Sequence, residues 1–239
     1  MDRLELLTWM TRNAFPAVAL LASVLALLAW ALISGSSSWT GGGFNVSGPE
    51  MPWLKEMLAL RAGMVVADVG AGKGQLTLAL AGAVGPVGHV FSSEIDPARV
   101  QALREAVADA SLSNVTIVEA RTNESGLRAG CCDAIVLRRV YHHLTEPGAI
   151  NASLLRALRP GGQLAVIDIP PLFFFPARSS LGIAPQVVIN EVTASGFEMR
   201  QLRTDWPGRG PLESYCALFQ KPLRMQEQIR HRMRQHAPS

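Results

Sequence analysis

Residues 64–74 join an apolar run to a glycine-rich turn. Residues 64–69 are apolar except for Asp68, as expected of a strand that is buried on both faces. Three alternating glycines follow, and a helical pattern begins directly after them: Gly70, Gly72 and Gly74. Glycine adopts positive φ and lets a ligand approach the main chain, and a helix N-terminus attracts anionic groups. The segment therefore predicts a strand–turn–helix unit with a ligand-binding turn.

Strand and helix patterns alternate after Glu50, which is typical of an α/β fold with a parallel sheet. Strands are predicted over residues 64–69, 89–93, 115–119, 133–137 and 163–169. Helices are predicted over residues 52–60, 75–84, 97–110, 147–158 and 184–195, and 159–162 (Arg-Pro-Gly-Gly) closes the fourth of them. Residues 198–203 and 215–221 are predicted to form a final antiparallel pair.

The spacing of the glycines separates three kinds of ligand. A phosphate-binding P-loop needs glycine where this chain has Ala67, and Ser or Thr where it has Gly74. A dinucleotide-binding turn has the spacing G-x-G-x-x-G, whereas this turn is G-x-G-x-G. The third kind of ligand, a nucleoside without a pyrophosphate, is compatible with this spacing. Glu94, at the end of the second predicted strand, is suitably placed to accept hydrogen bonds from both ribose hydroxyls.

Four segments in this order resemble the class I S-adenosylmethionine-dependent methyltransferases: residues 68–74 (DVGAGKG), Glu94, residues 132–136 (CDAIV) and residues 158–164 (LRPGGQL). The stretch 141–144 (YHHL) is similar to the small-molecule branch related to the ubiquinone/menaquinone C-methyltransferases. The resemblance covers residues 50–222. It implies a Rossmann-like, doubly wound sheet of seven strands whose last strand is antiparallel, with S-adenosyl-L-methionine as cofactor.

The resemblance also implies a set of cofactor-binding residues. The turn that follows Asp68 would hold the amino-acid end of the cofactor, Glu94 the ribose, and Ile95 one side of the adenine. Family members often have an acid after the third strand that meets the adenine amino group. This chain has Ala-Arg-Thr-Asn-Glu over 120–124, so Asn123 or Glu124 would serve instead.

Three residues after the fourth predicted strand are the candidates for catalysis: Tyr141, His142 and His143. They fall at the carboxyl edge of the sheet, where ligands bind in α/β folds, and a histidine can accept a proton near neutral pH. The alternative is that each histidine only pins the loop. Arg138 and Arg139 precede them as candidate contacts for an anion, and Asp168 is a weaker candidate. No metal site is predicted.

The N-terminal region predicts a membrane anchor. No charged residue occurs between Arg12 and Glu50, and residues 14–33 are interrupted only by Pro16 and Ser23. A helix of this length, at about 1.5 Å per residue, matches the hydrocarbon thickness of a bilayer. A signal peptide and a buried helix are the alternatives. The predicted organisation is a flank (1–13), a transmembrane anchor (14–33), a Gly/Ser-rich linker (34–49), a methyltransferase domain (50–222) and a basic tail (223–239).

The membrane topology stays open. Basic residues precede the apolar span and none follows it before Lys55, which by the positive-inside rule favours an exported domain. The cofactor, in contrast, belongs to the cytosol. Residues 221–239 hold five basic residues and one acidic residue, whereas the rest of the chain holds 17 basic and 18 acidic residues. A nucleic-acid-binding face is therefore not predicted, and the tail is a solvated helix or a contact for anionic lipid.

Together these patterns predict a single-pass membrane protein that transfers methyl groups to a small, apolar or membrane-associated acceptor. Three phenylalanines in the proline-bounded segment 170–176 are candidates for an apolar substrate pocket, a membrane contact or core packing. A non-catalytic cofactor-binding or scaffold protein is the main alternative. A nicotinamide oxidoreductase is disfavoured by the glycine spacing and by the antiparallel pair. The oligomeric state and the acceptor atom are not predicted.

Overall fold

The computed structural model describes residues 50–171, 176–179, 181–207 and 214–223. The predicted anchor (14–33), the linker (34–49), the phenylalanines at 173–175 and the tail after Leu223 lie outside the described residues. Within the described ranges, no helix has the length and apolar character needed to cross a membrane.

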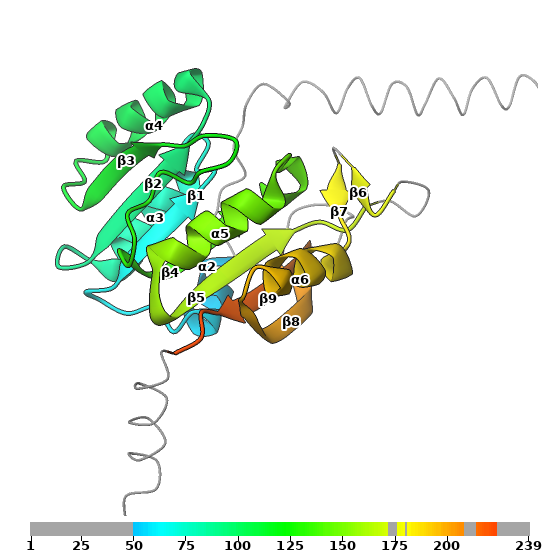
Figure 1. Ribbon diagram of the computed structural model, residues 1–239. Helices are drawn as coiled ribbons and strands as arrows, with labels where there is room; N and C mark the ends of the chain where they lie inside the picture. Colours follow the sequence, from blue (N-terminus) through cyan, green and yellow to red (C-terminus); the bar gives the residue numbers. More distant parts are fainter. Residues whose placement is uncertain (1–49, 172–175, 180, 208–213, 224–239) are drawn as a thin grey trace, which may run out of the picture. The chain divides into compact units, whose positions relative to one another are not determined.

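The described residues form a seven-stranded sheet with the order β3-β2-β1-β4-β5-β9-β8 (Figure 1). Its strands are β1 (Val65–Val69), β2 (His89–Glu94), β3 (Val115–Glu119), β4 (Cys132–Arg138), β5 (Leu158–Asp168), β8 (Glu198–Trp206) and β9 (Ser214–Gln220). The first five strands pair in parallel, and β9 is antiparallel to both β5 and β8. The predicted α/β fold and its antiparallel last strand are confirmed.

Helices pack on both faces of the sheet (Figure 1). One face is covered by α2 (Glu50–Met57) and α3 (Gln75–Val84), and α4 (Pro97–Asp109) contacts β2 and β3. The opposite face is covered by α5 (Pro147–Ala157) and α6 (Pro185–Ala194). Alternate residues of the central strands enter the two cores, so that Val66 and Val136 face one layer and Ala67 and Ile135 the other.

Two helices begin at the signals that the sequence provides. Asp96 caps α4, because its side chain accepts a 2.9 Å hydrogen bond from the N–H of Ala98, and Pro97 occupies the first turn. Gly74, in the left-handed conformation, precedes the first residue of α3.

The segment 158–162 differs from its prediction. Residues 159–162 are predicted to close a helix that ends at Leu158, but β5 begins at Leu158 and bulges before Gln163 continues the ladder with β4. The N–H of Gly161 donates to the carbonyl of Lys221, and the N–H of Lys221 donates to that of Gly162. Contact with the end of β9 therefore keeps this segment extended. The structure also contains a short pair, β6 (Arg178–Ser179) and β7 (Gly182–Ile183), that was not predicted.

Candidate functional site

The glycine turn lies at the carboxyl end of β1, and its glycines have different surroundings. All three have positive φ, with values of 75° at Gly70, 57° at Gly72 and 87° at Gly74. A Cβ atom on Gly70 would lie 2.4 Å from Val140, and one on Gly74 would lie 2.5 Å from Leu103. A Cβ atom on Gly72 would meet no described atom within 4 Å. Gly70 and Gly74 are thus required by packing, whereas Gly72 faces open space that a ligand could use.

Glu94 at the end of β2 is hydrogen-bonded to the glycine turn. One carboxylate oxygen accepts a 2.8 Å bond from the N–H of Gly72, and the other accepts bonds from Ile95 and Asp96. The N–H groups of Gly70 and Ala71 both donate to the carbonyl of Ser93. The end of β2 therefore orients the turn through its main chain and through this carboxylate.

Asp68 lies beneath the turn and is 2% exposed. Its carboxylate accepts a 2.7 Å hydrogen bond from the hydroxyl of Thr77 in α3, and that hydroxyl also contacts Ser92. Burial raises the pKa of Asp68 to about 6, and the bond from Thr77 opposes this shift. The side chain ties β1 to α3 and places a titratable acid below the candidate cofactor site.

Of the residues predicted to surround the adenine, Ile95 directly follows Glu94, and the segment that contains Asn123 and Glu124 starts near it. Ile95 is 52% exposed, which is unusual for a large apolar side chain and suits a surface that a flat ring covers. The N–H of Ala120 donates to the carbonyl of Glu94, so the segment 120–124 begins next to it. Asn123 is exposed. The carboxylate of Glu124 pairs with Arg156 at 2.7 Å, so it is already engaged by α5.

The carboxyl ends of β4 and β5 bring His142 and Asp168 together. Nδ1 of His142 lies 2.7 Å from a carboxylate oxygen of Asp168, and the two side chains are 7% and 0% exposed. The carboxylate also accepts hydrogen bonds from the N–H groups of His142 and Ile169. Such a carboxylate holds the ring in one tautomer and leaves Nε2 as the proton acceptor. Asp168 was predicted only as a weaker candidate, since its pairing depends on two strands lying side by side.

Tyr141 and His143 have different positions within the 3-10 helix η2 (Tyr141–His143). Tyr141 is fully buried and its hydroxyl accepts a 2.8 Å bond from Asn151, so the structure places it in the core. The ring of His143 lies 3.9 Å from that of His142, between centroids. Burial and then the neighbouring His142 lower the pKa of His143, which favours its neutral form. Catalytic roles for both residues stay predictions.

The two arginines at the end of β4 also differ. Arg138 forms a buried ion pair with Glu50 at 2.5 Å, and Glu50 accepts a further bond from the indole of Trp206. Sequence reasoning missed this network, because Glu50 is 88 residues away from Arg138. Arg139 has a φ of 57°, and burial lowers its pKa. A non-glycine residue in this conformation is uncommon and often lies at functional sites.

Among the described residues, no group of three or more His, Cys, Asp or Glu side chains could hold a metal ion. The arrangement instead offers an open turn, an acid after the second strand and a histidine held by a buried carboxylate. All three lie at the carboxyl edge of the sheet, where α/β folds bind ligands.

The fold described above is similar to that of solved S-adenosylmethionine-dependent methyltransferases. Residues 67–166 match the family model described as a methyltransferase domain, in agreement with the resemblance found in the sequence. A crystal structure of a SAM-dependent methyltransferase from Aquifex aeolicus is similar, with a TM-score of 0.64 and 22% identity over 74% of this chain and 92% of the other. At this identity the likeness establishes the fold.

Individual relatives are similar to only part of this chain. A ubiquinone/menaquinone biosynthesis C-methyltransferase, UbiE, from Shewanella halifaxensis is 31% identical over 114 residues. This alignment covers 47% of this chain and 45% of the relative, so the chain spans less than half the length of that relative. The crystal structure of the cyclase SpnF has a TM-score of 0.62 and 17% identity, over 73% of this chain and 81% of the other.

Proposed function

We propose that this protein transfers a methyl group from S-adenosylmethionine to a small, apolar or membrane-associated acceptor. The observation that carries the proposal is that the glycine turn with Glu94 and the His142–Asp168 pair both lie at the carboxyl edge of the same sheet. The matched methyltransferase domain and the fold support it.

The described residues fit the cofactor. Gly72 faces open space, the carboxylate of Glu94 is held next to it by a 2.8 Å hydrogen bond, and the exposed Ile95 offers an apolar surface to the adenine. Asp68 supplies negative charge below the turn, where it would attract the ammonium group of the amino-acid end. When bound, the cofactor supplies an activated methyl group on a sulfonium. The chain's part is to hold the acceptor in line and to exclude water.

His142 is the residue that we assign to proton removal. Nδ1–H of His142 donates to Asp168, which leaves Nε2 free of a proton. Nε2 can then remove a proton from the nucleophilic atom of the substrate that receives the methyl group. The acceptor class that needs this step is a hydroxyl or an acidic carbon. A tertiary amine or a thioether carries no proton on its nucleophilic atom, so its methylation would not be accelerated by the His142–Asp168 pair.

We place the protein at a membrane. The uncharged apolar segment 14–33 supports one spanning helix, and the linker that follows would let the methyltransferase domain reach molecules in the bilayer. The cofactor requirement favours a cytosolic domain. Protease digestion of sealed vesicles tests this: residues after Glu50 should be cleaved from the cytosolic side, and full protection would contradict the proposed topology.

A non-catalytic protein that binds the cofactor at a membrane is the second candidate. SpnF is a [4+2]-cyclase with a similar fold, so the fold alone does not require methyl transfer. Incubating the full chain with methyl-labelled S-adenosylmethionine and a membrane lipid extract separates the two. We expect label in a small molecule with the wild type and none with His142→Gln. Saturable cofactor binding without any labelled product would favour the non-catalytic protein.

A further inference from the structure

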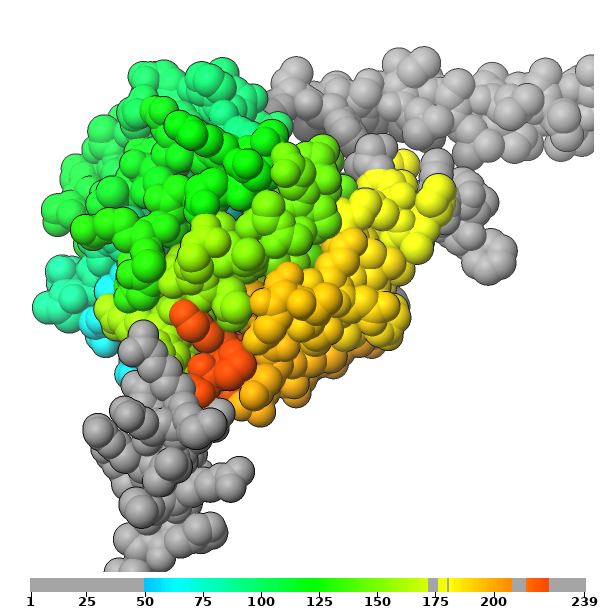
Figure 2. All heavy atoms as spheres, viewed as in Figure 1, coloured from blue at the N-terminus to red at the C-terminus, as the bar shows by residue number. Residues whose placement is uncertain are grey.

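One part of the sheet has no helix over it among the described residues. The face that carries α5 and α6 continues over β1, β2 and β3, but the chain between Glu119 and Cys132 contains no helix. In the space-filling view, the green residues between α4 and α5 adjoin the yellow-green residues of α5 and β5 (Figure 2). This connection covers the three strands only in part.

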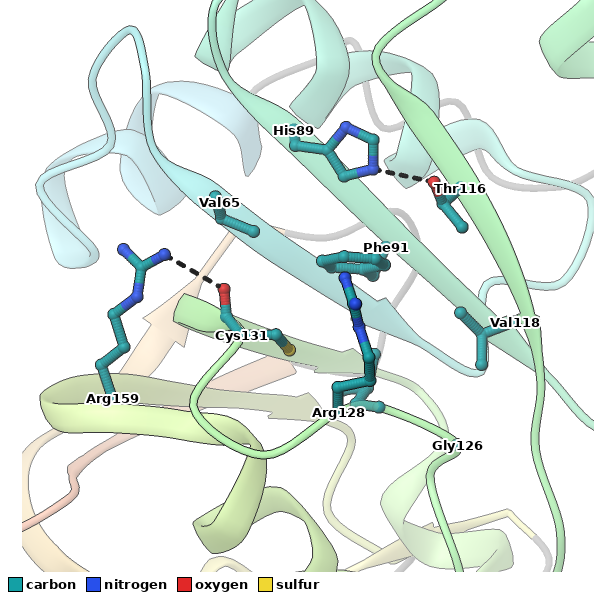
Figure 3. Close-up of a pocket in the computed structure, with 10 residues that line it drawn as sticks. Val65, His89, Phe91, Thr116, Val118, Gly126, Arg128, Cys131 and Arg159 are labelled. Atoms are coloured by element: carbon teal, nitrogen blue, oxygen red, sulfur yellow. Dashed lines mark hydrogen bonds between the residues drawn. The ribbon is translucent and has the colours of Figure 1, made fainter.

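A hollow of about 690 Å³ lies on the exposed portion of these strands. Figure 3 shows the residues around it, which come from four strands and from the connection before β4. The lining consists of Val65, His89, Phe91, Thr116, Val118, Gly126, Leu127, Arg128, Cys131 and Arg159. Its volume lies within the range of about 300–1,000 Å³ that is usual for small-molecule sites.

The floor of the hollow is apolar and aromatic. Phe91 is half-buried, and the ring of His89 meets it edge-on at 4.9 Å between centroids (Figure 3). Nε2 of His89 lies 2.9 Å from the hydroxyl of Thr116, which fixes the imidazole against the strand. Together with Val65 and Val118, these residues offer a flat surface suited to a planar apolar group.

The rim carries positive charge. The guanidinium of Arg128 lies over the ring of Phe91, 5.9 Å from its centroid, and no described carboxylate forms an ion pair with it. Arg159 is different, because it pairs with Asp133 at 2.5 Å and also donates to the carbonyl of Cys131. The thiol of Cys131 points into the hollow, and its pKa is lowered by a hydrogen bond from Cys132 and by both arginines.

The hollow begins at the opposite end of the strands from the candidate cofactor site. His89 begins β2 and Glu94 ends it, and five residues of strand span about 17 Å. Val65 likewise begins β1, whereas the glycine turn follows its end. The hollow also extends toward the cofactor site, because Phe91 lies three residues before Glu94 and Val118 pairs with Ser93.

We propose that this hollow binds a small aromatic carboxylate. Its ring system would lie on Phe91 and Val118, and its carboxylate would accept hydrogen bonds from the guanidinium of Arg128. An aromatic body suits the floor, and a single negative charge suits the one arginine at the rim that has no carboxylate partner in the described ranges. The inference does not rest on methyl transfer.

Alkylation of Cys131 in the full-length protein reports on occupation of the hollow. Iodoacetamide modification is followed at this cysteine by peptide mass spectrometry, with naphthoate as the probe and naphthamide as its uncharged match. Naphthoate should slow the alkylation of Cys131 in a saturable manner, and naphthamide should have little effect at the same concentration. This comparison needs no substitution. No protection by naphthoate, or equal protection by naphthamide, would overturn the proposal.

Two variants and the cofactor make the test specific. Arg128→Gln should raise the naphthoate concentration for half-protection by about tenfold, as expected for loss of a charged hydrogen bond. Arg104→Gln, at an exposed ion pair with Glu119 outside the hollow, should leave it unchanged. Protection should persist at saturating S-adenosylmethionine. Unchanged protection in Arg128→Gln, or its loss with the cofactor, would contradict a separate anion site.

Discussion

The carboxylate of Glu94 accepts a hydrogen bond of 2.8 Å from the main-chain N–H of Gly72. An acid after the second strand is therefore connected directly to the one turn glycine whose Cβ position is open. This contact orders the turn and leaves the second lone pair of the oxygen for a ligand. The cofactor site of our account is built around this pair.

Replacing Gly72 by alanine should impair cofactor binding while leaving the protein folded. The new methyl group meets no protein atom, so it projects into the space assigned to the ligand. The left-handed conformation should reduce the free energy of unfolding by about 1–2 kcal/mol. Calorimetric titration should show that the affinity for S-adenosylmethionine falls by at least about tenfold.

Gly70→Ala is the matched comparison at the same turn. A methyl group there would lie 2.4 Å from the branched side chain of Val140. Overpacking adds about 1–3 kcal/mol to the cost of the left-handed conformation, so urea denaturation should show a larger loss than in Gly72→Ala. Equal stability of the two variants would contradict the distinction between a packing glycine and a ligand-facing glycine.

His142→Gln should lower kcat about 10²- to 10⁴-fold and leave the Kd of S-adenosylmethionine within about twofold. The reason is that the ring held by Asp168 is assigned to proton removal, whereas cofactor binding is assigned to the glycine turn and Glu94. Asp168→Asn should also lower kcat, because the amide no longer fixes the tautomer of His142. His143→Gln should have a smaller effect. A larger loss in His143→Gln than in His142→Gln would reverse the assignment.

Asp68 should make stability depend on pH in a defined direction. Its pKa in the folded protein is about 6, above the ordinary 3.8, so the folded state binds more protons than the unfolded state between these values. The contribution of Asp68 to the free energy of unfolding is therefore present below about pH 4 and falls as pH rises to about 6. Wild type and Asp68→Asn, compared by urea denaturation, should differ in this range by up to about 3 kcal/mol. A difference independent of pH would contradict the raised pKa.

The ion pair between Glu50 and Arg138 should be essential for stability. Both side chains are largely buried, at 8% and 13% exposure, so removing one charge leaves the other without compensation. Glu50→Gln should lower the free energy of unfolding by about 3–5 kcal/mol. The double variant Glu50→Gln/Arg138→Met should lose less than the sum of the two single variants, as measured in a double-mutant cycle.

Local patterns predicted the elements that local sequence determines. The turn glycines, the cap at Asp96 and the position of Glu94 at a strand end depend on residues close in the chain, and the structure places each as expected. Strand β1 was visible as an apolar run because it lies in the middle of the sheet and is largely buried.

Local sequence patterns did not predict the contacts between residues that are distant in the chain. The pairing of His142 with Asp168 depends on the parallel register of β4 and β5. The bulge after Leu158 depends on bonds to the end of β9, although its glycines alone indicate a turn. The hollow on β1–β3 depends on how the chain between β3 and β4 covers the sheet, for which periodicity gives no signal.

Calorimetric titration of the full-length protein with S-adenosylmethionine tests the central claim most directly. We expect saturable binding with one molecule per chain, and loss of that binding in Glu94→Ala without loss of the folded state by circular dichroism. Absence of binding at millimolar cofactor, or unchanged binding in Glu94→Ala, would contradict the account.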